Sequence, residues 1–382
     1  MDLYKHHQRV WKLLYFILKP VVRHKFNPDF EEIKVDGPII LITNHCTTWD
    51  PLLLAMALKK KQVYYVASEH IFRLGFVSKL IIWLVDPIAR KKGASAGDTT
   101  SRCLEHLHAG HSVCIFGEGE QSWDGLSRTV IRGTGKLVKD SGVTLVTYRM
   151  IGGFLSLPRW ADKVRKGCIK GEVAGVYTPE ELKDKTPEEI NEIMNKDLFV
   201  DVWQFQKENK IRYKSDCMAE HLERMLYLCP KCLSTTGLRS SGSHLNCDCG
   251  LELTVNEYGL FEPADPFANL AEWEKWQKKN VRDLNFRKVS DDILFRQDDS
   301  TLKEIYGNHE VKELASGPLA MSNDELICAD YHFPLKDIRR MAMTRFGVLL
   351  FTYDDHYYQI KIEGEVNLRK YLEIWKKINN KE

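Results

Sequence analysis

The sequence has almost no excess of charge of either sign and no long apolar run. Its 55 lysines and arginines are balanced by 53 aspartates and glutamates, so the formal net charge is +2 and does not favour nucleic acid as a partner. No apolar run reaches the ~18 residues that span a bilayer, which argues against a transmembrane protein. An apolar fraction of 43% excludes a largely disordered chain. At ~150 residues per domain, 382 residues predict two or three domains.

Strand-like and helix-like segments alternate over residues 29–178. This alternation predicts an α/β domain with a mixed sheet flanked by helices. Asp50 and Pro51 are typical of the N-cap and first position of a helix. The expected strands are 37–43, 63–67, 113–116 and 143–149, and the expected helices are 51–58, 71–85 and 100–109.

Residues 179–382 do not continue this alternation of strand-like and helix-like segments. Residues 179–226 are polar with a helical pattern, and we interpret them as a helical linker. A cysteine cluster follows within residues 227–262, and residues 263–382 form a β-rich module capped by a helix. In this module Asp354 and Asp355 separate two apolar runs, which predicts a hairpin. The module resembles a pleckstrin-homology fold, which would suit a lipid or partner contact; a plain packing module is the alternative.

Residues 1–28 are predicted to contain an amphipathic helix over 4–19 that ends at Pro20. A basic stripe of Lys5, Arg9, Lys12 and Lys19 lies opposite an apolar face rimmed by aromatic residues. This pattern is typical of a helix that lies in a membrane surface, and it predicts a cytoplasmic protein that is peripheral on the membrane. Packing of the apolar face on the domain is the alternative. A signal peptide is disfavoured because the apolar core is short and no cleavage site follows.

Asn44, His45 and Asp50 lie in the segment that directly follows the strand at 37–43. Ligands of open α/β sheets collect at the carboxyl ends of strands, so this position favours a site. His45 and Asp50 can meet only if the chain turns between them, because five residues on a helix would place them ~140° apart. A histidine oriented by a carboxylate is a competent general base. The alternative is that Asp50 only caps the following helix.

Two further loops carry possible ligand-binding residues. Phe116 to Ser122 places Gly117 and Gly119 around Glu118, which indicates either a tight loop at a ligand or a simple turn. Arg90, Lys91 and Lys92 form a cationic trio that would hold a phosphate or lie in a solvated turn.

Taken in order, these three segments resemble the motifs of the PlsC-like glycerolipid (lysophosphatidate) acyltransferase superfamily over residues 30–176. The extensions resemble those of bacterial members with additional C-terminal modules, here a zinc ribbon. The matching positions are Asn44, His45 and Asp50 in the first motif, Ile88 and Arg90 in the second, and Phe116, Glu118, Gly119 and Ser122 in the third.

The resemblance implies transfer of a fatty acyl group to the hydroxyl of a lysophospholipid, such as lysophosphatidate, in phospholipid synthesis. The donor would be acyl-CoA or an acyl-carrier-protein thioester. His45 would remove the hydroxyl proton and Asp50 would hold the imidazole. Asn44, Glu118, Gly119 and Ser122 would belong to the acceptor site, and Arg90 would hold the acceptor phosphate.

The third motif departs from the family pattern. Gly117, Glu120 and Gln121 stand where the family has proline, threonine and arginine. The lost arginine removes a bidentate phosphate partner. We expect Arg128 or Arg132 to replace it. The segment 145–148 also lacks the proline of the fourth motif, so acyl transfer is better supported than lysophosphatidate as the acceptor.

Four cysteines form two close pairs, Cys229 with Cys232 and Cys247 with Cys249. Two such pairs suit the tetrahedral coordination of a structural zinc ion. Disulfides are disfavoured in a chain without a secretion signal. A closed four-thiolate site is structural, so nucleic acid is not an expected partner, although residues 207–214 are basic. The remaining cysteines, expected to be reduced thiols, are Cys46, Cys103, Cys114, Cys168, Cys217 and Cys328.

Two other functions fit parts of the sequence. Residues 93–97 satisfy the nucleophile-elbow pattern around Ser95, but a basic segment stands where that motif needs a strand. This would be an α/β-hydrolase-type esterase. The other alternative is a zinc-bearing membrane adaptor with a decayed catalytic domain, and the altered third motif favours it.

Overall fold

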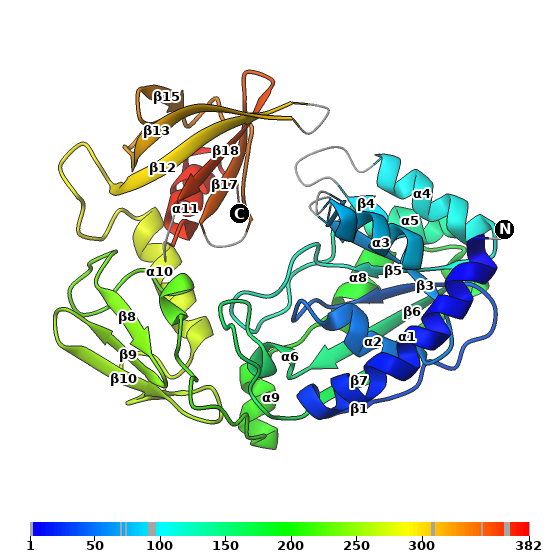
Figure 1. Ribbon diagram of the computed structural model, residues 1–382. Helices are drawn as coiled ribbons and strands as arrows, with labels where there is room; N and C mark the ends of the chain where they lie inside the picture. Colours follow the sequence, from blue (N-terminus) through cyan, green and yellow to red (C-terminus); the bar gives the residue numbers. More distant parts are fainter. Residues whose placement is uncertain are drawn as a thin grey trace. The chain divides into compact units, whose positions relative to one another are not determined.

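The computed structural model describes residues 3–68, 71–72, 75–90, 97–306, 310–344, 347–362 and 367–381. The chain divides into two compact units (Figure 1). The first comprises Met1–Ser215 with Glu257–Gly259, and the second comprises Asp216–Asn256 with Leu260–Glu382.

The first unit contains a mixed seven-stranded sheet in the order β1-β7-β6-β2-β5-β3-β4. β6 and β7 pair antiparallel, and the other neighbouring strands pair parallel. The predicted mixed α/β class and the four expected strands are therefore confirmed. The strands are β1 (Pro28–Phe30), β2 (Ile39–Thr43), β3 (Val63–Ser68), β4 (Ile88–Arg90), β5 (Ser112–Phe116), β6 (Thr144–Ile151) and β7 (Ile169–Tyr177).

β2 is buried on both sides because helices cover both faces of this sheet. Ile39 and Leu41 pack in a core with residues of α1 and α2, whereas Ile40 and Ile42 pack with residues of α4, α5 and α8. A strand buried on both faces reads as a continuous apolar run, as residues 39–42 do. The helices of this unit are α1 (Leu3–Phe26), α2 (Asp50–Leu58), α3 (Phe76–Val85), α4 (Gly97–His108), α5 (Gly133–Ser141), α6 (Gly153–Ser156), α7 (Pro179–Leu182), α8 (Pro187–Leu198) and α9 (Val202–Asn209).

Helix α1 is longer than the predicted helix, since it continues through Pro20 to Phe26. Val22 and Phe26 are fully buried, and this packing outweighs the hydrogen bond that proline cannot donate. The expected end at Pro20 was wrong. The side that packs on the domain is the aromatic edge with Trp11 and Tyr15, and much of the apolar face remains exposed.

The parallel strands place their following loops along one edge of the sheet. β6, β2, β5, β3 and β4 all run in the same direction, so their carboxyl ends lie together. The loop after β2 carries His45, and the loop after β5 carries Glu118. This edge therefore brings the first and third motifs side by side.

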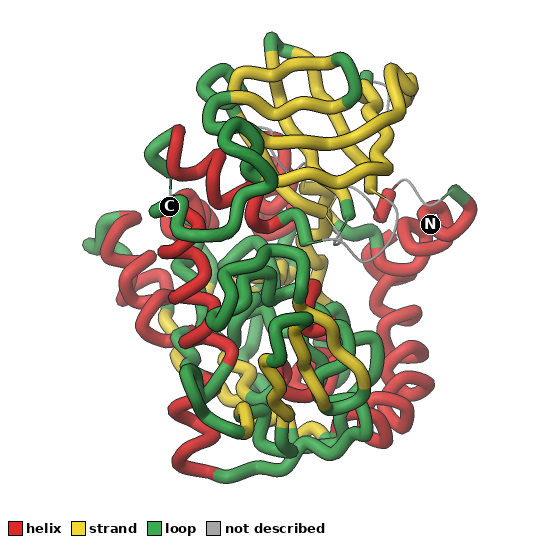
Figure 2. Tube along the Cα trace, turned by 90° about the vertical axis from the view of Figure 1, so that its left-hand side faces the viewer, coloured by secondary structure: helices red, strands yellow, loops and turns green. Residues whose placement is uncertain are grey.

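The second unit contains two antiparallel sheets. One has four strands in the order β11-β10-β9-β8, and the other has seven in the order β15-β14-β13-β12-β18-β17-β16. The larger sheet is the broad ladder of strands in Figure 2. Its β17–β18 hairpin turns at Asp354 and Asp355, whose φ values of 48° and 61° confirm the predicted two-residue turn.

The elements of the second unit include two helices that pack together, α10 and α11. Among the helices that the structure describes, none combines the length and apolar character needed to cross a bilayer. The elements are η2 (Leu222–Arg224), β8 (Leu238–Ser241), β9 (His244–Cys247), β10 (Leu251–Val255), β11 (Phe261–Glu262), α10 (Leu270–Arg282), β12 (Phe295–Ile305), β13 (Val311–Met321), β14 (Glu325–Cys328), β15 (Tyr331–Pro334), β16 (Arg340–Thr344), β17 (Val348–Tyr353), β18 (His356–Ile362) and α11 (Arg369–Ile378).

Candidate active site

His45 and Asp50 meet in the loop between β2 and α2. Nδ1 of His45 lies 2.7 Å from Oδ2 of Asp50, and the side chain of His45 is 19% exposed while that of Asp50 is 1% exposed. The imidazole stacks on the ring of Phe116, with 4.3 Å between the ring centroids. Nδ1 donates to the carboxylate, so Nε2 is the ring nitrogen available to accept a proton.

The carboxylate of Asp50 is fixed by further hydrogen bonds from its own loop. The backbone N–H groups of Cys46 and Thr47 donate to Oδ2 over 2.6 and 3.0 Å, and the hydroxyl of Thr47 donates to Oδ1 over 2.9 Å. The N-cap of α2 is Trp49, so the expectation that Asp50 caps this helix was wrong. Asp50 begins the helix instead and points back to the loop.

Asn44 ties the end of β2 to the end of β6. Its side-chain amide donates to the carbonyl of Met150 and accepts from the N–H of Met150, each over 2.8 Å. Asn44 is 2% exposed. These two bonds fix the start of the loop that carries His45.

Glu118 is a buried carboxyl that connects the two loops. Oε1 accepts the backbone N–H of His45 over 3.2 Å, and Oε2 accepts the backbone N–H of Arg128 over 3.0 Å. Burial raises the pKa of Glu118 to about 7, although both hydrogen bonds favour its ionised form. Its carboxyl therefore titrates close to physiological pH.

The loop after Glu118 is closed by Gly119 and Ser122. Gly119 has a φ of +71°, and a side chain there would meet Ile131. The N–H of Ser122 donates to the carbonyl of His45 over 2.9 Å, and its hydroxyl donates to the carbonyl of Leu126. Ser122 thus holds the loop against His45.

Glu120 contacts two arginines on the other side of this loop. It forms ion pairs with Arg128 and with Arg159, the latter over 3.5 Å. The indole N–H of Trp123 also donates to it over 3.4 Å. Sequence reasoning did not find Arg159, because it lies 39 residues from Glu120 and outside every motif.

Arg90 lies at the end of β4, and Arg132 directly precedes α5. Arg90 ends β4, which is the third strand from β2, so about 14 Å separates the two strands at ~4.8 Å per strand. Arg132 is exposed ahead of α5, and its carbonyl accepts from Asn191. Ser95, Lys91 and Lys92 lie outside the described residues.

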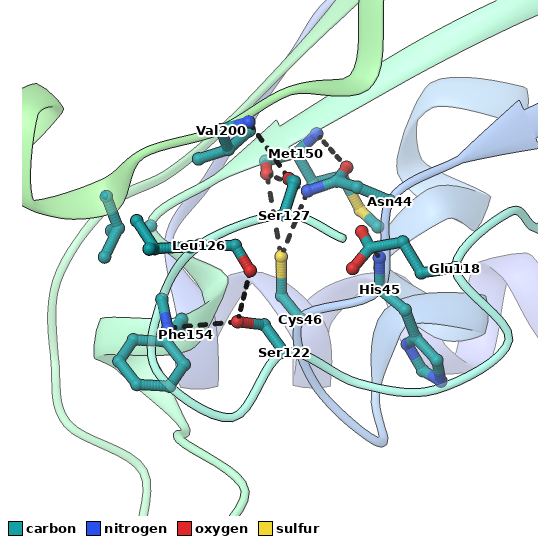
Figure 3. Close-up of a pocket in the computed structure, with 13 residues that line it drawn as sticks. Asn44, His45, Cys46, Glu118, Ser122, Leu126, Ser127, Met150, Phe154 and Val200 are labelled. Carbon is teal, nitrogen blue, oxygen red and sulfur yellow. Dashed lines mark hydrogen bonds between the residues drawn. The ribbon is translucent and has the colours of Figure 1, made fainter. Parts of the chain in front are cut away.

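A small cavity lies behind His45, lined by Asn44, Cys46, Ser122 and Phe154 among others (Figure 3). Its volume of about 10 Å³ leaves room for a single water molecule. The imidazole of His45 points away from it in Figure 3. This cavity is therefore too small for a lipid headgroup or an acyl chain.

The four cysteines of the second unit converge as the sequence predicts. All four sulfur atoms lie within 4.8 Å of one another. Cys229 lies 3.6 Å from Cys249 and Cys232 lies 3.8 Å from Cys247, measured between sulfur atoms. Four ligands at ~2.3 Å around a tetrahedral zinc are about 3.8 Å apart, so the spacing fits this metal.

Comparison with known proteins finds similarity to acyltransferases. Residues 26–151 match the family described as Acyltransferase. A curated relative, the chloroplastic 1-acyl-sn-glycerol-3-phosphate acyltransferase of Arabidopsis thaliana, is 25% identical over 130 residues, which is 34% of this chain and 36% of that protein. The crystal structure of the 1-acyl-sn-glycerophosphate acyltransferase PlsC from Thermotoga maritima aligns with a TM-score of 0.44 at 17% identity, covering 55% of this chain and 84% of that one.

The α/β unit therefore contains a segment, residues 26–151, that is similar to acyltransferase domains. The match to a 1-acyl-sn-glycerol-3-phosphate acyltransferase confirms the resemblance to the PlsC-like glycerolipid superfamily. The chain spans about a third of the length of this curated relative.

Proposed function

We propose that this protein is an O-acyltransferase that moves a fatty acyl group from an acyl-thioester to the hydroxyl of a lysophospholipid. The observation that carries this proposal is the contact between His45 and the buried Asp50, at the carboxyl end of β2 in an acyltransferase domain. An acyl-CoA or an acyl-carrier-protein thioester would be the donor. The product would be a diacyl phospholipid.

His45 would act as the general base. Asp50 holds Nδ1, so Nε2 would accept the proton of the acceptor hydroxyl while the oxygen attacks the thioester carbonyl carbon. The tetrahedral intermediate would then expel the thiolate as the C–S bond breaks, and His45 would return the proton to sulfur. No acyl-enzyme is needed, so the reaction uses neither Cys46 nor Ser122 as a nucleophile.

The other residues of the motifs would orient this pair and bind the acceptor. Asn44 would be a positioning residue, because Met150 engages both ends of its amide. Glu118, Gly119 and Ser122 would shape the acceptor site through the loop that they hold against His45. Arg90 would reach the acceptor from the third strand along the same edge.

We also propose that α1 and α3 place the domain on a membrane. The two helices pack together, and His6 donates to the carbonyl of Trp83 over 3.1 Å. Ten large apolar side chains on these helices are 39 to 78% exposed, whereas large exposed apolar patches are rare on soluble monomers. They are Leu3, Leu13, Phe16, Ile17 and Val21 on α1 and Phe76, Val77, Leu80, Ile82 and Trp83 on α3.

An anionic lipid surface is the occupant that suits this face. Lys5, Arg9 and Lys12 lie on the same helix as the exposed apolar residues, and such a combination binds anionic headgroups. A variant with Phe16→Ser and Phe76→Ser should lose at least about tenfold in binding to phosphatidylglycerol vesicles, since each ring loses favourable burial. Flotation checks this, with Val289→Ser in the second unit as the control. Equal flotation of both variants would contradict the membrane surface.

We propose that the four cysteines hold a structural zinc ion. The sulfur spacing supports it, as does the burial of Cys229 and Cys247. A bound zinc would offset two of the four thiolate charges and join two turns. All four positions are protein ligands, which leaves no place for a substrate.

The test of the acyltransferase is product formation from radiolabelled acyl-thioester and a panel of lysolipids. The wild type should acylate at least one acceptor, and His45→Ala should form no product. His108→Ala, an exposed histidine on α4, is the matched control and should keep wild-type activity. If folded wild-type protein binds vesicles but acylates nothing with either donor, the adaptor function replaces the enzyme.

A further inference from the structure

Tyr65 lies on β3, two strands from β2 and outside the three sequence motifs. It pairs with Cys114 on the neighbouring strand β5. Phe116 follows two residues later on β5, so its side chain lies on the same face of the sheet as that of Tyr65. Both rings pack with the core that contains residues of α1 and α2.

The ring of Tyr65 belongs to a series of nearly parallel rings that ends at His45. The centroids of Tyr65 and Phe116 are 6.4 Å apart and their planes differ by 14°, which is an offset parallel arrangement. Phe116 in turn stacks on the imidazole at 4.3 Å and is 8% exposed. Because Phe116 contacts both rings, a change at Tyr65 reaches the imidazole through it.

The hydroxyl of Tyr65 reaches the backbone beside the other member of the pair. It donates to the carbonyl of Pro51 over 3.1 Å, and Pro51 directly follows Asp50 in the first turn of α2. Burial raises the pKa of Tyr65 well above its usual value, so the hydroxyl stays protonated and remains a donor. This bond restrains the turn that carries the carboxylate of Asp50.

Tyr65 is itself supported from α1. The ring of Trp11 lies 6.1 Å from that of Tyr65, measured between centroids, and Trp11 is 6% exposed. The indole N–H of Trp11 donates over 3.1 Å to the carbonyl of Lys59, which is the C-cap of α2. The aromatic side chains of α1 and β3 therefore hold both ends of α2.

We propose that Tyr65 is a positioning residue for the acyl transfer. Its ring holds the imidazole of His45 through Phe116, and its hydroxyl holds the backbone next to Asp50. This inference rests on the proposed acyltransferase function. A general base must keep its accepting nitrogen within reach of the hydroxyl proton, and a misplacement of about 1 Å can cost ~100-fold in rate. Loss of Tyr65 should therefore lower kcat and leave KM for the acceptor nearly unchanged.

The kinetic test compares three variants with radiolabelled acyl-thioester and the lysolipid that the wild type uses. Tyr65→Phe keeps the ring and loses one hydrogen bond, so kcat should fall about three- to tenfold. Tyr65→Leu loses the ring as well, and its kcat should fall about 30-fold or more. KM should change by less than about twofold in both. Tyr148→Phe is the matched control and should keep its kcat, because it also removes a hydroxyl that donates to a backbone carbonyl, that of Glu31, over 3.0 Å.

A spectroscopic measurement follows the imidazole directly. Protein labelled with ¹³C at histidine Cε1 gives a signal for His45, which is assigned by its loss in His45→Ala. Stacking on Phe116 shields the ring protons, so at one fixed pH the signal should move downfield in Phe116→Leu and, by less, in Tyr65→Leu. It should stay in place in Tyr148→Phe. Thermal unfolding shows whether each variant is folded, and the kcat of Tyr65→Phe carries the test if Tyr65→Leu does not fold.

Each outcome decides a different claim. An unchanged kcat in Tyr65→Phe overturns the part played by the hydroxyl, and an unmoved His45 signal in folded Tyr65→Leu overturns the part played by the ring. An equal loss of kcat in Tyr148→Phe, or an effect of the Tyr65 variants on KM alone, overturns both. If the wild type acylates no acceptor, the proposed function is overturned, whereas the His45 signal still decides whether Tyr65 holds the imidazole.

Discussion

The His45–Asp50 pair of the first unit and the four-cysteine cluster of the second differ in what holds their side chains in place. Asp50 accepts hydrogen bonds from His45, from two backbone N–H groups and from the hydroxyl of Thr47, so its charge is satisfied within the loop. The four sulfur atoms lie within 4.8 Å of one another and would repel as thiolates. The first site is complete without a ligand, whereas the second would be stabilised by the proposed cation.

This difference separates reactivity from stability. A site whose side chains are held by hydrogen bonds within the protein does not need a ligand for its geometry. Its loss should therefore lower the reaction rate more than the free energy of unfolding. A cluster that needs a metal links the metal to the fold itself.

The largest expected effect is that of metal removal on the second unit. Structural zinc contributes on the order of 10 kcal/mol in small zinc domains, so chelation or Cys232→Ser should unfold the segment around the cluster. Hydrogen exchange should rise over residues 229–249 and stay unchanged over residues 39–50. Cys217→Ser, a buried cysteine of the same unit outside the cluster, is the control. Equal protection from hydrogen exchange over residues 229–249 with and without metal would contradict a structural role for the metal.

Next in size is the effect of Asp50→Asn on rate. The amide cannot hold the imidazole in the same tautomer, so kcat should fall on the order of 10²–10⁴-fold. Exchange over residues 229–249 should be unaffected. Asp140→Asn on α5, where Asp140 pairs with Lys136 at the surface, should keep its kcat. If Asp50→Asn lowered the free energy of unfolding as much as chelation does, the proposed difference between the two sites would be wrong.

The smallest of the three effects concerns Glu118 and pH. Burial raises its pKa from 4.5 to about 7, so between these values the folded protein binds a proton that the unfolded chain has released. Stability from this group is present below about pH 4.5 and lost as pH rises through 7. The free energy of unfolding of Glu118→Gln, relative to that of the wild type, should therefore rise by up to about 3 kcal/mol between pH 4.5 and pH 8. Urea unfolding measures this, and a pH-independent difference would contradict it.

Short spacings in the sequence were enough to predict that His45 meets Asp50 and that the four cysteines converge. His45 and Asp50 are five residues apart in the segment that follows β2, and each cysteine pair lies within a single turn. The strands 39–43 and 112–116 could be predicted because a strand buried on both faces is a plain apolar run. The mixed α/β class followed from the alternation of such runs with helices.

Contacts between distant residues could not be predicted in the same way. Arg159 reaches Glu120 only because the chain folds back after β6, and no local pattern marks it. Pro20 indicates a helix end, but burial of Val22 and Phe26 keeps α1 continuous. Asp50 before a helix suggests a cap, whereas its carboxylate serves the preceding loop. In each case tertiary packing decided among local preferences.

The last helix of the second unit also has a consequence for how the protein is made. Lys370 on α11 donates to the carbonyl of Thr235, which lies between the cysteine pairs 135 residues earlier. At 5–20 residues per second, a ribosome needs roughly 7 to 27 s to synthesise this interval. During that time the two cysteine turns lack the helix that later supports them. A metal ion captured early would keep the nascent segment in shape until its partner emerges.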